Sequence, residues 1–125
     1  MATRGTIAVH HADGTVSQIY AHWDNYLEGT GQLLLDCYNT LELAEDLIKP
    51  GDISSVGSDV AHTEYYGRDR SEDGAEPNIY SNLNSYHRYL LGEEFNYLFT
   101  RGQWLVEYLG TDGEYVSLAE AVQTA

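Results

Sequence analysis

Hydrophobic and polar residues alternate at the start of the chain, and this alternation predicts a β-hairpin. A first strand over residues 4–11 places Ile7 and Val9 on one side. The return strand continues the alternation, and its two faces carry Val16 with Tyr20 and Ile19 with Ala21. The pair Asp13-Gly14 between the strands predicts a type I′ turn, in which both central residues take positive φ.

The pattern then changes to a helical period. Four apolar positions recur at helical spacing, namely Leu34, Cys37, Tyr38 and Leu41. Asn39 followed by Glu42 has the form of a capping box for a second helix, which Pro50 and Gly51 end. This pattern is compatible with one kinked helix or with two separate helices.

Alternation returns in the second half of the chain and predicts another hairpin. Arg101-Gly102 forms its turn. The first strand of this hairpin has two faces, one with Phe95, Tyr97 and Phe99 and the other with Asn96 and Leu98. A second Asp-Gly turn and a short strand follow, and a terminal helix begins near Ser117, three residues before Glu120.

The middle of the chain is less regular. Residues 61–70 resemble a strand that enters a loop, and residues 71–78 combine Gly and Pro with acidic residues, as mobile segments do. Residues 79–91 are compatible with a helix or a strand. Hairpins interrupted by helices predict an α+β fold, in which an antiparallel sheet built from hairpins has two or three helices packed on one face. The length of 125 residues predicts one domain over residues 1–125.

Net charge restricts the classes of partner. Lys and Arg total 6 against 20 Asp and Glu, which gives a net charge of −14 at pH 7. Such a chain repels nucleic acid and anionic membranes and is attracted to basic protein surfaces. The start of the chain has no apolar core of signal-peptide length, and no later run is long enough to span a bilayer. We therefore expect a cytoplasmic protein whose partner is a protein with a basic surface, without direct nucleic-acid or membrane binding.

Clusters of carboxylates are the first candidate site. If folding gathers them on one face, they would imitate the phosphate rows of a nucleic acid and occupy a basic groove on another protein. The alternative is an acidic surface that only keeps the protein in solution. The candidate partner-binding residues are Glu64, Asp69, Glu72, Asp73, Glu76, Glu93 and Glu94.

Two other groups of residues form an alternative site that binds a metal or a small molecule. His22 and Asp24 lie two residues apart, and with His10 or His11 across the hairpin they would make a His/Asp metal site. Arg68 and Arg70 would form an anion clamp, or would instead neutralise the acidic surface through ion pairs.

The segment at residues 19–29 has a structural interpretation as well. In that interpretation it forms the corner between strand and helix, Trp23 is buried near Leu34 or Tyr38, and His22 makes an internal hydrogen bond. The lone Cys37 rules out an internal disulfide and is interpreted as a small buried hydrophobe. Known motifs of hydrolases, nucleotide-binding proteins and zinc proteases are missing from the sequence, so we expect neither an enzyme nor a cofactor.

Several of these segments also resemble a family of small acidic proteins that bacteriophages and prophages encode. The resemblance rests on TRGTIAVHHADGTVSQIYAHWDNY (residues 3–26), GDISSVG (51–57), YYGRDR (65–70) and the hairpin EFNYLF…GQWLV. This chain has Ala21 in place of the family's cysteine and Asn25 in place of its glycine. The resemblance implies a phage context, in which small acidic proteins block host defence complexes of the restriction or CRISPR type.

Overall fold

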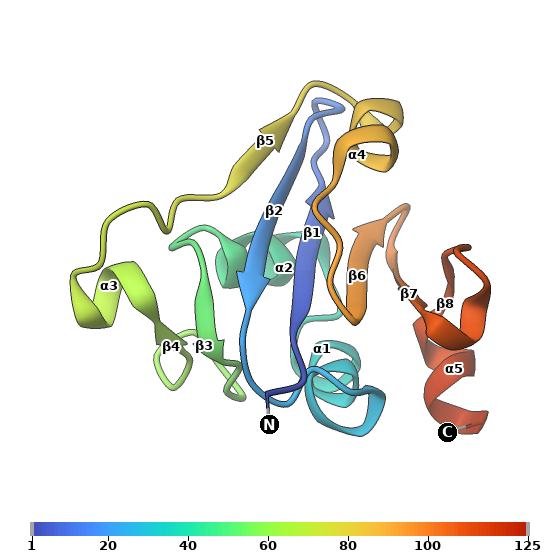
Figure 1. Cartoon of the computed structure of the whole chain (residues 1–125), viewed down its shortest axis with the longest axis horizontal. Coiled ribbons are helices and arrows are strands. Elements are labelled where there is room, and N and C mark those ends of the chain that lie inside the picture. The colour runs from blue at the N-terminus through green and yellow to red at the C-terminus, as the bar shows by residue number, and fades with distance from the viewer. Residues whose placement is uncertain (1, 125) are drawn as a thin grey trace.

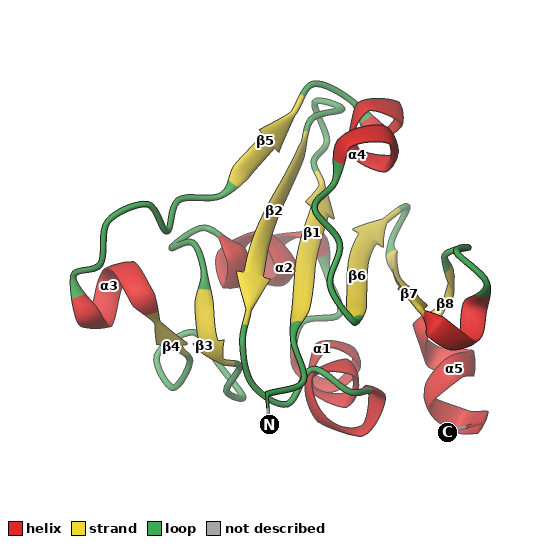
Figure 2. Cartoon of the chain, in the orientation of Figure 1, coloured by secondary structure: helices red, strands yellow, loops and turns green. Residues whose placement is uncertain are grey.

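The computed structural model describes residues 2–124, which form an eight-stranded sheet with helices on both faces (Figures 1 and 2). The strands are β1 (Gly5–His10), β2 (Val16–Ala21), β3 (Ile53–Ser55), β4 (Glu64–Tyr65), β5 (Asn78–Tyr80), β6 (Phe95–Thr100), β7 (Gln103–Tyr108) and β8 (Val116–Ser117). The α-helices are α1 (Gln32–Cys37), α2 (Leu41–Ile48), α3 (Tyr66–Arg70), α4 (Leu83–Tyr89) and α5 (Leu118–Thr124). A π-helical turn η1 (Leu27–Gly31) precedes α1, and a 3₁₀ turn η2 (Leu109–Thr111) follows β7.

The sheet confirms the α+β prediction, with one addition. Its strand order is β4-β3-β2-β1-β6-β7-β8, and β5 pairs with the part of β2 beyond β3. Most neighbouring strands are antiparallel, but β1 pairs in parallel with β6 and β2 pairs in parallel with β3. The sheet is therefore mixed, because the two predicted hairpins join side by side through β1 and β6 and not through a further turn.

The first hairpin forms as predicted, with a different turn. Gly14 N–H donates to the His11 carbonyl and His11 N–H donates to the Thr15 carbonyl, so the loop has three residues and not two. Gly14 has φ +93° whereas Asp13 keeps negative φ, which is the arrangement of a three-residue loop with a glycine bulge. The type I′ prediction is wrong here. A two-residue turn with positive φ at both central residues occurs instead in the second hairpin, at Arg101 and Gly102.

The sheet has a large core on one face and a small one on the other. Helices α1, α2 and α5 cover the first face, where Ile7, Val9 and Ile19 lie in a cluster that also includes side chains of these helices. Helix α4 covers the opposite face (Figure 1). Its Tyr86 packs there on Ala8, Val16 and Leu98. The predicted faces of both hairpins are therefore correct, and three helices share one face as expected.

The helical region after residue 26 consists of two separate helices. Helix α1 ends before Tyr38, whose carbonyl accepts a hydrogen bond from Trp104 Nε1 at 2.8 Å. Helix α2 then begins after Thr40, whose Oγ1 accepts from Leu43 N–H at 3.2 Å. The predicted cap at Asn39 is wrong by one residue. The predicted cap of α5 is confirmed, since Ser117 Oγ accepts from Glu120 N–H.

The ambiguous middle of the chain contains both kinds of element. Residues 79–91 divide into the end of β5 and helix α4, which Asn82 caps through a 2.8 Å bond from Ser85 N–H. Residues 61–70 form the short strand β4 and then helix α3 instead of a loop. Across residues 2–124, the structure has no helix with both the length and the apolar character that crossing a bilayer requires.

Candidate functional site

Asn25 is the residue that holds the corner between β2 and η1. It is fully buried, and its Nδ2 donates to the carbonyls of Thr3 and Ala21 at 3.0 Å and of Trp23 at 3.2 Å. The Asn25 carbonyl in turn accepts from the Tyr97 hydroxyl. The corner is thus built by a side-chain amide that satisfies main-chain groups.

Trp23 does not have the predicted position. Its side chain is 43% exposed instead of buried near α1, and its ring lies perpendicular to the His22 ring with the two centroids 4.6 Å apart. The adjacent Asp24 has φ +61°, and this left-handed residue turns the chain so that Trp23 faces outward. The large apolar side chains of the corner that pack inward are Leu27 and Leu34 instead.

The alternative metal site is spread out in the structure. His22 Nδ1 lies 2.7 Å from the Tyr20 hydroxyl, so the predicted internal hydrogen bond of His22 is present. His10 is bonded to Thr100 on β6 and His11 to Glu45 on α2. Within residues 2–124, the side chains of His, Cys, Asp and Glu do not gather in threes at metal-binding distance.

The two arginines of the alternative anion clamp are paired within the chain. Arg68 donates from Nε and Nη2 to the Asp69 carboxylate at 2.9 Å, and its remaining donors reach the carbonyls of Val60 and Thr63. Arg70 donates to Glu64 at 2.6 Å. The hydrogen bonds that Asp69 accepts from the Arg68 side chain and from the Tyr65 main-chain N–H lower the pKa of its carboxyl below the ordinary value. The contacts favour the ion-pair interpretation, since each guanidinium already binds a carboxylate and Arg68 also uses Nε, Nη1 and Nη2 within the chain.

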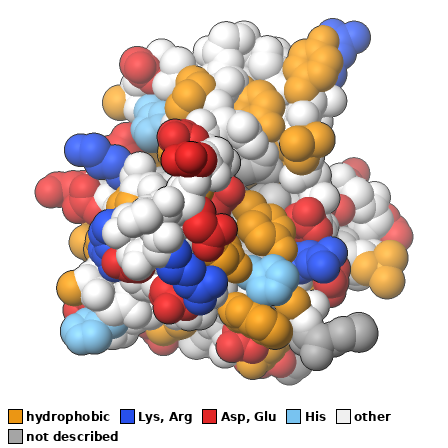
Figure 3. Space-filling model, turned by 60° about the vertical axis from the view of Figure 1, so that its left-hand side comes forward, with side chains coloured by type: hydrophobic (Ala, Val, Ile, Leu, Met, Phe, Trp, Pro, Cys, Tyr) orange, Lys and Arg blue, Asp and Glu red, His pale blue; other side chains and the backbone are white. Residues whose placement is uncertain are grey.

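The same ion pairs divide the seven candidate acidic residues into two groups. Glu64 and Asp69 are neutralised by arginines of helix α3. In the part of the chain that the structure describes, the other five have no ion-pair partner, and they are Glu72, Asp73, Glu76, Glu93 and Glu94. Figure 3 shows acidic and basic side chains next to one another on this side of the molecule.

Two of the unpaired carboxylates line a polar pocket of about 170 Å³, which we call the acidic pocket. Glu76 and Glu93 line it together with Asp52, Gln18 and other side chains of both sheet and loop. Asp52 Oδ1 accepts from the Tyr20 main-chain N–H at 2.8 Å. Burial raises the pKa of the Asp52 carboxyl, and the negative charge of Glu76 raises it further.

A buried amide also faces the acidic pocket. Gln18 Oε1 accepts from the Tyr80 hydroxyl at 2.9 Å, whereas Gln18 Nε2 has no hydrogen-bond partner among the described residues. A buried unpaired donor costs about 1–3 kcal/mol, so a water molecule or a ligand atom in the pocket would stabilise the protein by accepting this hydrogen bond.

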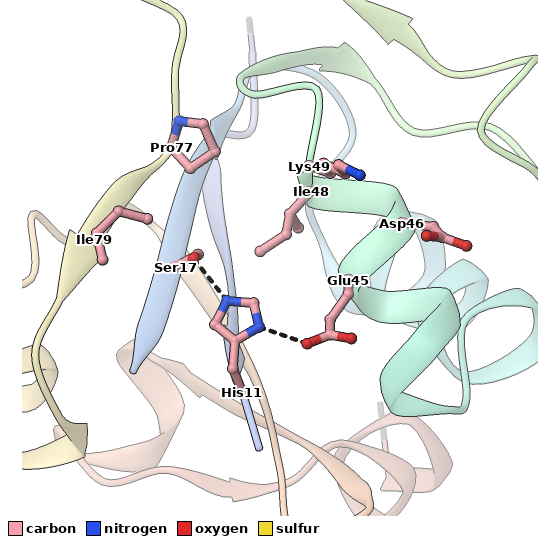
Figure 4. A pocket seen from close by; sticks show the side chains of 8 residues that line it. All are labelled: His11, Ser17, Glu45, Asp46, Ile48, Lys49, Pro77 and Ile79. Carbon is pink, nitrogen blue, oxygen red and sulfur yellow. Dashed lines mark hydrogen bonds and ion pairs between the residues drawn. The ribbon is translucent and has the colours of Figure 1, made fainter. Parts of the chain in front are cut away.

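A second pocket, of about 440 Å³, lies on the other face of the sheet between β2, β5 and α2 (Figure 4). His11 stands in its centre. His11 Nε2 lies 2.7 Å from Ser17 Oγ, and His11 Nδ1 lies 2.6 Å from Glu45 Oε2. Ile48, Pro77 and Ile79 give the pocket apolar walls, and we call it the His11 pocket.

The chemistry of the three groups assigns the protons. An ionised carboxylate only accepts hydrogen bonds, so His11 Nδ1 carries a hydrogen that it donates to Glu45. In the neutral imidazole Nε2 is then the acceptor, and the Ser17 hydroxyl donates to it. The order hydroxyl, imidazole and carboxylate is the order that activates a serine for nucleophilic attack.

Sequence reasoning did not identify this group. His11 lies in the β1–β2 loop, Ser17 on β2 and Glu45 on α2, so no short motif contains all three. The alternation of the first hairpin does put Ser17 on the same face as Ile19, which is the face that α2 covers. That placement was the one signal available, and it does not name the partners of the serine.

Comparison of the chain with protein-family models, with curated proteins and with solved structures finds no match.

Proposed function

We propose that this protein is a phage-type acidic inhibitor that binds the basic surface of a host protein which handles nucleic acid in a defence complex, of the restriction or CRISPR type. The resemblance of its N-terminal half to small acidic phage proteins suggests the context. The excess of 20 carboxylates over 6 Lys and Arg residues supplies the attraction.

The observation that carries the proposal is the unpaired acidic pocket. Asp52, Glu76 and Glu93 line one concave site in which the described residues provide no cation. A lysine or arginine of a partner that entered this site would pair with carboxylates that now repel one another. The exposed Leu91 on its rim provides an apolar contact at the same place.

The division of the acidic residues also defines the expected contact region. Glu64 and Asp69 already have cationic partners, so they offer a basic surface little further attraction. The binding face that we propose is therefore centred on the acidic pocket and uses Glu72, Asp73, Glu76, Glu93 and Glu94. Imitation of nucleic acid would come from this face and not from the segment of Arg68 and Arg70.

The test begins with capture of partners from bacterial extracts on the immobilised protein. The captured protein is identified, purified and titrated with the inhibitor at low and high ionic strength. We expect binding to weaken with salt, and we expect the inhibitor to displace nucleic acid from the partner. Binding that does not depend on salt, or nucleic acid that stays bound, would contradict the proposal.

A pair of charge-matched variants locates the binding face. The double variant Glu76→Gln/Glu93→Gln removes two charges at the acidic pocket, and Glu114→Gln/Glu120→Gln removes two exposed charges near β8 and α5. We expect the first variant to bind the purified partner about tenfold more weakly, which corresponds to about 1.4 kcal/mol. Equal losses in both variants would mean that net charge, and not this face, determines binding.

A further inference from the structure

The His11 pocket contains the parts of a nucleophilic site. Ser17 Oγ, the two nitrogens of His11 and Glu45 Oε2 form one chain of short hydrogen bonds, 2.7 and 2.6 Å long. Both distances lie in the range of about 2.6–3.2 Å within which a base takes a proton from a nucleophile and a third group orients the base. The three residues line a pocket of about 440 Å³, which is large enough for a small organic molecule.

We propose that Ser17, His11 and Glu45 form an acyl-transfer site for a small, uncharged carboxylic ester. This activity is separate from the proposed inhibitor function, because the His11 pocket and the acidic pocket lie on opposite faces of the sheet. Ser17 is the nucleophile, His11 is the general base and then the general acid, and Glu45 orients the imidazole and stabilises its positive charge.

The reaction proceeds in two steps, acylation and deacylation. Ser17 Oγ forms a bond to the ester carbonyl carbon while its proton passes to His11 Nε2. The bond from that carbon to the alcohol oxygen then breaks, and the alcohol leaves with the proton from Nε2. In the second step a water molecule gives its proton to His11 and attacks the acyl-serine, which releases the carboxylic acid and returns the proton to Ser17 Oγ.

The pocket walls define the substrate class. Ile48 and Pro77 offer apolar contacts, and Ile79 is 66% exposed beside them, so the body of the substrate is apolar. Asp46 and Lys49 have opposite charges on the same rim, which gives no preference for a charged substrate. An ester fits better than an amide, because the hydrogen-bond chain supplies proton transfer and an alcohol leaves more readily than an amine.

Burial of the nucleophile limits the size of the reacting group. Ser17 is only 8% exposed, since β1 and β5 flank it and the His11 ring covers it. The hydroxyl therefore meets a substrate only from the pocket side, past Ile48 and Ile79 in Figure 4. A short, unbranched acyl group suits this entry better than a bulky one.

A small alkyl fluorophosphonate tests the proposal directly. Attack by Ser17 forms an O–P bond, expels fluoride and leaves a mass increase on one peptide. We expect Ser17 to react at least about 100-fold faster than Ser81, an exposed serine that serves as the internal reference. Hydrolysis of a short-chain nitrophenyl ester, measured as the difference between the protein and its Ser17→Ala variant, provides the second readout.

Matched variants separate a catalytic group from a structural one. Glu45→Gln keeps an acceptor for Nδ1–H but removes the charge, and Glu42→Gln removes an exposed charge from the same helix. We expect labelling of Ser17 to fall about tenfold or more in Glu45→Gln and in His11→Gln, and to stay unchanged in Glu42→Gln. Circular dichroism shows whether each variant is folded.

The rate of Ser17 labelling in the variants decides whether Ser17 is a nucleophile. Labelling of Ser17 that depends on Glu45 supports the assignment, even if His11→Gln fails to fold. A folded protein in which Ser17 reacts no faster than Ser81 overturns it, as does labelling that is equal in Glu45→Gln and Glu42→Gln. In either of those cases the hydrogen-bond chain only ties the first hairpin to α2.

Discussion

Gly5 and Asn25 share a space that holds one side chain: a Cβ atom on Gly5 would lie 2.8 Å from Asn25 Cβ. The same atom would lie 2.9 Å from the Phe95 carbonyl oxygen, which belongs to the neighbouring strand and cannot move aside cheaply. The glycine of β1 thus permits the buried amide that closes the corner.

This fit predicts that both residues are needed for stability. Gly5→Ala should lower the free energy of unfolding by about 1–3 kcal/mol through overpacking. Asn25→Ala should lower it by about 1–3 kcal/mol, because the buried Ala21 carbonyl loses its donor. Urea unfolding measures both, with Asn84→Ala on the exposed side of α4 as the control. A loss in Asn25→Ala no larger than the control's would contradict this role of the corner.

The exposure of Trp23 leads to a second prediction, opposite to that of the sequence. A buried Trp23 would make Trp23→Ala cost about 3–5 kcal/mol. Because the indole is 43% exposed, we expect a cost of about 1 kcal/mol or less. Trp104→Ala is the contrasting variant, since Trp104 is buried and its Nε1–H bonds the Tyr38 carbonyl. Thermal melts that showed similar losses for the two tryptophans would refute the outward position of Trp23.

The start of α2 distinguishes two neighbouring residues. Thr40→Ala removes the hydroxyl that accepts from Leu43 N–H and should cost about 1 kcal/mol. Asn39→Ala should change stability by a few tenths of a kcal/mol, or about 0.5 at most, since Asn39 is exposed and precedes the cap. Chemical unfolding of the two variants under the same conditions measures the difference, and the reverse order would place the cap at Asn39.

Asp52 predicts an unusual dependence of stability on pH. Its pKa in the folded protein is raised above the ordinary 3.8. In the pH window between these two pKa values, the folded state binds more protons than the unfolded state. Stability therefore falls as pH rises through the window. Asp52→Asn cannot ionise and keeps an oxygen for the Tyr20 N–H. At neutral pH it should melt at or above the wild-type temperature, and the advantage should vanish below about pH 4.

Asp13 provides a control of opposite sign. Hydrogen bonds from the Thr15 side chain and main chain lower the pKa of the Asp13 carboxyl. The stability that its carboxylate contributes is present above the ordinary value of 3.8 and is lost as pH falls through the lowered pKa. Asp13→Asn should therefore destabilise at neutral pH and not in acid. An Asp52→Asn variant that behaved in the same way would show that the Asp52 carboxylate is favourably placed.

Strand faces could be predicted from the sequence because alternation is a local property. The inward position of Ile7, Val9 and Ile19 follows from a period of two and from the choice of the apolar side. The type of turn was not predictable in the same way. The turn type depends on which residues form the last pair of the hairpin. Here His11 pairs with Thr15 and leaves a three-residue loop. That register is set by packing along the whole hairpin.

The candidate sites depend on contacts between distant segments, which local patterns do not contain. Arg68 and Asp69 are neighbours in the sequence, so their ion pair is local. The bonds from Arg68 to the Val60 and Thr63 carbonyls depend on how the loop before β4 folds back toward α3. His11 and Glu45 are separated by 34 residues and meet because α2 lies across β1 and β2. Sequence reasoning could name these residue types without knowing which of them meet.

The parallel pairing of β1 with β6 has a consequence for synthesis on the ribosome. The two strands meet along five residues, and Thr6 Oγ1 donates to Asn96 Oδ1 across a separation of 90 residues. Until β6 has emerged, one edge of β1 has open main-chain groups that can pair with another nascent chain. The central sheet therefore cannot close until residues 95–100 have been synthesised, and fragments that end before residue 95 should accumulate as aggregates.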